Sequence, residues 1–87
     1  MKYKLQIRKT ALKSLKRIPK DDVIVINEAI QSLKVEPRPS GVVKMKGYDS
    51  LYRIRVGNYR VLYEIIDNQL KIIIIKIAHR KEIYDKR

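Results

Sequence analysis

The chain has 87 residues, 45% of them hydrophobic, which suits one domain (residues 1–87) built around one small core. It has no cysteine and one histidine, which excludes disulfides and thiolate metal sites and makes us expect no metal or other cofactor. A formal net charge of +12 predicts an acidic partner, which could be nucleic acid, an anionic membrane surface or an acidic protein, although abundant lysine also serves solubility.

The first predicted elements are a strand and a helix. Residues 3–8 alternate apolar and polar side chains, which is typical of a half-buried strand. Apolar residues then recur at helical spacing from Ala11 to Ile18, with Thr10 as the expected N-cap and Pro19 as the interruption. The N-terminal residues alternate in polarity and do not form the apolar stretch of a signal peptide, so we expect a soluble cytoplasmic protein with no membrane partner.

A second helix is predicted after Pro19, with Asp21 or Asp22 as its cap. The Val-Ile-Val-Ile run at residues 23–26 favours a strand by local propensity. We still predict a helix, because residues 27–34 continue the helical spacing and break the alternation. Its expected apolar stripe consists of Val23, Ile26, Ala29, Ile30 and Leu33.

Four strands are predicted in the second half of the chain, at residues 42–45, 52–56, 59–66 and 70–77. The first would carry Lys44 and Lys46 on the same side. Asp67-Asn68 is a turn signal, and a two-residue loop there would place Glu64 opposite Lys71. The last strand is almost continuously apolar, as expected of a strand covered on much of both faces.

The element order is therefore β-α-α-β-β-β-β. It predicts an α+β fold in which an antiparallel sheet carries an N-terminal helical hairpin on one face. The opposite face of such a sheet is left available for binding.

The most informative feature is the hairpin around Gly57-Asn58, a two-residue turn signal that aligns Val56 with Tyr59 and Arg55 with Arg60. Alternation then places Arg53 on the same face as these two arginines. Like charges directly across a ladder are destabilising, so a fold that accepts them is expected to bind an anion between or above them. Guanidinium groups match the geometry of phosphate, which favours nucleic acid.

The hairpin at residues 52–64, Tyr-Arg-Ile-Arg-Val-Gly-Asn-Tyr-Arg-Val-Leu-Tyr-Glu, and the ending Ala-His-Arg-Lys-Glu-Ile-Tyr at residues 78–84 resemble the RelE/ParE toxin superfamily, on its RelE side. The resemblance covers essentially the whole chain. It implies the toxin of a type II toxin–antitoxin system: a ribosome-dependent, metal-independent endoribonuclease that cleaves mRNA in the ribosomal A site. It also implies a cognate antitoxin, acidic at its toxin-binding segment, and the net charge fits such a partner.

In that family, basic hairpin residues, an arginine after the last strand and a tyrosine in the tail surround the scissile phosphate. By motif position, the resemblance gives these roles to Arg53, Arg55, Arg60, Arg80 and Tyr84. Two hairpin positions that are lysine in the best-known member are arginine here, at Arg53 and Arg55. Since arginine stays protonated, the identity of the general base is left open.

Other residues have both functional and structural interpretations. His79 has an unperturbed pKa near neutrality and is a candidate acid or base, yet a lone histidine beside a strand is often structural. Tyr84 could stack on a base or act in catalysis, or it could only anchor the tail. Lys44 and Lys46 are candidates for RNA binding within a diffuse basic surface.

Two other functions are compatible with the sequence. The ParE side of the superfamily inhibits DNA gyrase and needs no RNA-cleaving centre, although Arg80 followed by Tyr84 favours the nuclease. A non-enzymatic basic module that binds RNA would keep the arginine-bearing face without cleaving.

Overall fold

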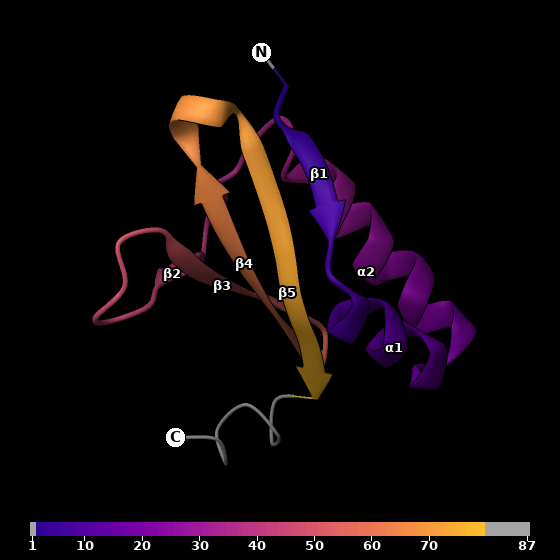
Figure 1. Ribbon diagram of the computed structural model, residues 1–87. Coiled ribbons are helices and arrows are strands. Elements are labelled where there is room, and N and C mark those ends of the chain that lie inside the picture. Colours follow the sequence, from indigo (N-terminus) through magenta and orange to yellow (C-terminus); the bar gives the residue numbers. More distant parts are fainter. Residues whose placement is uncertain (1, 80–87) are drawn as a thin grey trace.

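The computed structural model describes residues 2–79. In chain order, its elements are β1 (Lys4–Ile7), α1 (Lys9–Arg17), α2 (Lys20–Ser32), β2 (Val43–Lys44), β3 (Leu51–Val56), β4 (Tyr59–Ile66), the 3-10 helix η1 (Asp67–Gln69) and β5 (Lys71–His79). The strands form one five-stranded sheet in the order β1-β5-β4-β3-β2, and both helices lie on the same side of it (Figure 1). The predicted element order and the helical layer are confirmed.

The sheet is mixed and not antiparallel throughout. β1 runs parallel to β5, with Lys4 in register with Lys71 and Ile7 in register with Ile74, while the other three pairings are antiparallel. The sequence pattern showed a strand at the N-terminus but not its neighbour. Because β1 pairs with β5, which is the last strand along the chain, β5 has a partner on both edges. This agrees with its predicted interior position.

Both predicted helix caps are wrong. α1 begins at Lys9 because the backbone N–H of Arg8 still bonds to Ile74 and the chain turns directly from strand to helix. Thr10 therefore lies inside the helix, and its hydroxyl donates to the carbonyl oxygen of Ile75 at 2.8 Å. In α2, Pro19 occupies the N-cap position, and Asp21 and Asp22 lie in the first turn. Carboxylates at this end of a helix interact favourably with the helix dipole.

The predicted apolar stripe of α2 faces the sheet. Ile26, Ile30 and Leu33 are each 1% exposed, and they pack with the buried side chains of β3, β4 and β5. The run at residues 23–26 is helical, and its burial follows helical spacing. Ile26 faces the core, while Ile24 and Val25 lie on the exposed side of the helix. Within residues 2–79, neither helix is long and apolar enough to cross a membrane.

The hairpin between β3 and β4 has the predicted register. Val56 pairs with Tyr59 and Arg55 pairs with Arg60. Gly57 has a φ of +61°, which is the left-handed conformation that the first central position of a type II′ turn requires. The alternate residues Tyr52, Ile54 and Val56 are buried on the helix side of the sheet.

The predicted two-residue turn between β4 and β5 is wrong. Residues Asp67–Gln69 form a 3-10 turn and Leu70 adopts a left-handed conformation with a φ of +50°, so Ile66 pairs with Lys71. Glu64 consequently pairs with Ile73 across the strands and accepts a hydrogen bond from the Ser50 hydroxyl at 2.9 Å. The expected contact between Glu64 and Lys71 does not form.

A polar cluster fastens this turn to the loop after α2. The Nη2 and Nη1 atoms of Arg38 donate to Asp67 at 2.8 and 3.4 Å, and the Tyr3 hydroxyl donates to Asp67 Oδ1 at 2.7 Å. Arg38 also lies over the Tyr52 ring, 5.1 Å from its centroid. These contacts explain why Asp67 does not enter a tight two-residue turn.

The pKa of the Asp67 carboxyl is lowered below its ordinary value by the hydrogen bonds from Arg38 and then Tyr3. A lowered folded-state pKa stabilises the fold above the unfolded-state pKa, and this contribution disappears as the pH falls through the folded-state value. Asp67→Asn should therefore lower the free energy of unfolding at neutral pH, and the deficit should vanish in acid. Urea unfolding across a pH series measures this difference, and a deficit that stays constant down to strongly acidic pH would contradict it.

Candidate functional site

The face of the sheet opposite the helices carries the three predicted arginines. Arg55 on β3 is directly in register with Arg60 on β4, and Arg53 is in register with Leu62. Because paired residues project to the same side of a sheet, these side chains share one surface. We call the surface formed by Arg53, Arg55 and Arg60 the arginine face.

The three guanidinium groups differ in exposure. Arg55 is exposed, Arg53 is partly buried, and Arg60 is 7% exposed. The Nε atom of Arg55 donates to the carbonyl oxygen of Gly57 at 3.2 Å, which holds its side chain near the hairpin turn. An anion that binds from the solvent side can reach the exposed Arg55 first and then the buried Arg60. Its interaction with Arg60 is the stronger of the two, since charge interactions strengthen with burial.

Lys76 also lies on this side of the sheet, which the sequence did not predict. Lys76 on β5 is in register with Leu62, whose other neighbour is Arg53. A register shift between Leu62 and Tyr63 inserts one extra residue into β5 and reverses its alternation from that point. Without this bulge Lys76 would project toward the helices. No turn or composition signal in the sequence marks its position.

His79 lies on the other side of the sheet. It is the last residue of β5 and pairs with Tyr59, whose ring it meets edge to face at a centroid distance of 5.8 Å. The Tyr59 hydroxyl donates to Asp22 at 3.2 Å, and burial followed by this contact raises the pKa of Tyr59. The structure therefore places His79 with a tyrosine and the helix layer, apart from the arginine face.

Lys44 does not lie on the arginine face either. Lys44 on β2 is in register with Tyr52, which projects to the helix side, and Lys46 follows the strand; both are exposed. Arg80 and Tyr84 lie outside the described residues. Within residues 2–79, no group of three or more histidine, aspartate or glutamate side chains is arranged to hold a metal ion.

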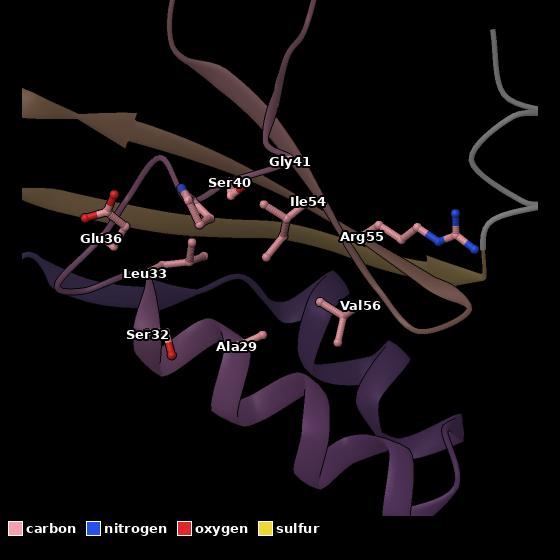
Figure 2. A pocket seen from close by; sticks show the side chains of 10 residues that line it. Ala29, Ser32, Leu33, Glu36, Ser40, Gly41, Ile54, Arg55 and Val56 are labelled. Carbon is pink, nitrogen blue, oxygen red and sulfur yellow. The ribbon is translucent and has the colours of Figure 1, made fainter.

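A groove of about 510 Å³ opens beside β3 on the helix side. Figure 2 shows Ile54 and Val56 pointing toward α2, while the Arg55 side chain extends away along the hairpin. Its other lining residues come from α2 and the following loop: Ala29, Ser32, Leu33, Glu36, Pro39, Ser40 and Gly41. The groove is mainly apolar, and Arg55 is the residue that it shares with the arginine face.

The family model of the ParE toxin of type II toxin–antitoxin systems, parDE, matches residues 5–84 of the chain. The chain belongs to the RelE/ParE toxin family. The toxin RelE3 of Methanocaldococcus jannaschii is 40% identical over 86 residues, which cover 94% of this chain and 96% of that protein. This similarity over nearly the full length identifies a RelE-like toxin of a type II toxin–antitoxin system.

Two solved structures of RelE-like toxins share the fold. The archaeal RelE–RelB complex from Pyrococcus horikoshii matches with a TM-score of 0.82 and 34% identity, covering 92% of this chain and 97% of that chain. The RelB–RelE antitoxin–toxin complex from Methanococcus jannaschii matches with a TM-score of 0.77 and 34% identity, covering 94% and 98%. Both relatives were solved with an antitoxin bound, which supports a cognate antitoxin as a partner of this family member.

The Arg55–Arg60 pair makes a stability prediction. Arg55→Gln should raise the free energy of unfolding by about 0.2–1 kcal/mol at low salt, because it removes a like charge directly across the ladder. The gain should shrink at high salt, where the repulsion is screened. Chemical unfolding at two salt concentrations measures it.

Lys13→Gln, on the exposed surface of α1, is the control for the change in net charge. Equal gains in the two variants would show that the Arg55–Arg60 pairing has no specific cost.

Proposed function

We propose that this RelE-like toxin is a ribosome-dependent, metal-independent endoribonuclease that cleaves mRNA in the ribosomal A site and thereby inhibits translation in the cytoplasm. The observation that carries the proposal is the register of Arg55 with Arg60, with Arg53 on the same face. Three guanidinium groups gathered on one side of a sheet form an anion site suited to phosphate.

The reaction would be an attack of the ribose 2′-hydroxyl on the adjacent phosphorus. A bond forms between the 2′-oxygen and phosphorus as the 2′-hydroxyl gives its proton to a base, whose identity is left open. The bond to the 5′-oxygen breaks, and that oxygen takes up a proton and leaves as a 5′-hydroxyl, while the negative charge on the phosphate increases in the transition state. Fixed cations aimed at that charge accelerate such a step. Arg60 fits this role best, because it is the most buried of the three arginines.

We assign Arg53 and Arg55 to substrate positioning, since they are more exposed than Arg60 and border it on β3. The family resemblance gives Arg80 a second phosphate-stabilising role and gives Tyr84 a role next to the reacting ribose or base. We give His79 a structural role, because its ring packs on Tyr59 on the opposite side of the sheet.

The chemistry of the site supports a dependence on the ribosome. Arginine remains protonated at physiological pH and is a poor proton acceptor, so the arginine face supplies charge more readily than a base. Orientation of the 2′-hydroxyl in line with the leaving oxygen is worth many orders of magnitude in rate. A ribosome that holds the mRNA in that geometry would supply what the toxin lacks.

We further propose that the cognate antitoxin is acidic where it binds the toxin. The net charge of +12 favours such a partner, and carboxylates placed over the arginine face would block access of RNA.

Inhibition of DNA gyrase is the second candidate function, because the matching family model is described as a ParE toxin. That activity needs no phosphate-stabilising centre. The wild-type toxin and every variant of the arginine face would then leave RNA intact. A basic RNA-binding module without catalysis is the third, and it would bind RNA without cutting it.

Primer extension on translating ribosomes tests the proposal. The wild-type toxin should produce cuts within codons at the A site, with little cleavage of naked RNA. Arg60→Ala should reduce the cleavage rate by roughly 10²- to 10³-fold, the cost of removing one well-placed donor to a transition-state charge. Arg80→Ala and Tyr84→Phe should also weaken it.

Folding of each variant is checked by circular dichroism, and Lys13→Gln is the control for lost charge on the helix side. Full-rate cleavage by a folded Arg60→Ala variant would refute its assignment. Absence of cleavage by the wild-type toxin, with gyrase inhibited, would support the second candidate.

A further inference from the structure

We infer that Lys76 is a phosphate-binding residue of the RNA site and extends the arginine face from β3 and β4 onto β5. This inference rests on the proposed function in its choice of RNA as the ligand. It adds a residue that neither the hairpin motif nor the tail motif contains.

The strand register brings Lys76 to the arginines. Leu62 on β4 lies between Arg53 on β3 and Lys76 on β5, and it is in register with both. Neighbouring strands are about 4.8 Å apart, so the backbones of Lys76 and Arg53 are roughly 10 Å apart across one row of the sheet. Arg60 pairs with Ala78, which makes it the diagonal neighbour of Lys76, at about 7–8 Å for such positions. Long cationic side chains at these separations can converge on one sugar–phosphate backbone.

The bulge in β5 is what places Lys76 there. On the regular register set by the β4–β5 turn, in which Ile66 pairs with Lys71, Lys76 would be opposite Val61, which is completely buried against the helices. An unpaired ammonium group in that position would be costly. The extra residue instead puts Ile77 into the core at 1% exposure and turns Lys76 outward, onto the face that already carries the arginines.

A solvent-facing position in this part of the sheet could be filled by any polar residue. Lys76 has Arg60 as one diagonal neighbour and Glu64 as the other, and the repulsion lies on the side of Arg60, which already faces Arg55. An anion that contacts Arg55, Arg60 and Lys76 lowers that repulsion. The partly exposed Leu62 provides an apolar floor between Lys76 and Arg53, where a ribose or base can rest while phosphates on either side meet the cations.

Lysine suits a flanking phosphate, because its ammonium group is a point charge on a flexible stem with no required plane. In this arrangement the arginines hold the phosphate that reacts, and Lys76 holds a neighbouring one. It is a positioning residue, and its contribution should appear in RNA affinity and in the dependence of affinity on salt.

The experiment measures binding of a fluorescently labelled single-stranded RNA oligonucleotide to the full-length toxin by anisotropy across a series of salt concentrations. Lys76→Gln should weaken binding by up to about fivefold at low salt. It should also reduce the slope of log affinity against log salt by about 0.7, the value for one phosphate contact on a single strand. Lys76→Arg, which keeps the charge, should bind like the wild-type toxin.

Lys16→Gln is the matched control, because Lys16 is an exposed lysine on α1 on the opposite side of the sheet. Equal effects of Lys76→Gln and Lys16→Gln would overturn the inference, as they would show only a change in net charge. Loss of binding in Lys76→Arg as large as in Lys76→Gln would also overturn it, because a charge contact survives that exchange. Circular dichroism confirms folding, and Lys76→Thr replaces the glutamine variant if that variant does not fold.

The assay separates this inference from the proposed function. RNA binding that depends on Lys76, in a toxin that cuts no ribosome-bound message, would support the RNA site while refuting the nuclease. Ribosome-dependent cleavage with RNA affinity unaffected by Lys76→Gln would support the nuclease and refute the role of Lys76 in RNA binding.

Discussion

The register of the β3–β4 hairpin is the constraint on which both the core and the candidate site depend. A side chain on a strand projects to one face or the other according to its position, so a turn that fixes which residues pair also divides them between the faces. Gly57, in its left-handed conformation, closes the turn so that Val56 meets Tyr59. That one pairing buries Tyr52, Ile54 and Val56 under the helices and leaves the arginines on the opposite surface.

The fold gathers cations on that surface. Arg55 and Arg60 face each other, and the bulge in β5 brings Lys76 to the same side without disturbing the isoleucine core around Ile77. The core has enough buried apolar surface to tolerate this repulsion, because nearly every helix-side position of β4 and β5 is covered. Repulsion between Arg55 and Arg60 is expected to strengthen anion binding, since a bound anion relieves it.

Local signals in the sequence predicted the features that depend on local chemistry. The Gly57-Asn58 turn, the hairpin register and the shared face of Arg53, Arg55 and Arg60 required only alternation and one turn type. The predictions from the sequence were wrong where contacts between distant residues determine the local structure. Thr10 bonds to β5 rather than capping a helix, and Asp67 is held by Arg38 and Tyr3 in a wider turn than its residues suggest. The side on which Lys76 lies depends on a bulge with no sequence signature, and the helix-side position of His79 follows from the same shift.

The surface of the protein that contacts RNA decides most directly whether the arginine face is the binding site. A chain of 87 residues is small enough for complete amide assignment by NMR, and titration with a short single-stranded RNA would map the contact surface residue by residue. We predict that the largest shifts fall on β3, β4 and the second half of β5, with little change along α1 and α2. Shifts confined to the helices, or none at all under conditions where the RNA binds, would contradict this prediction.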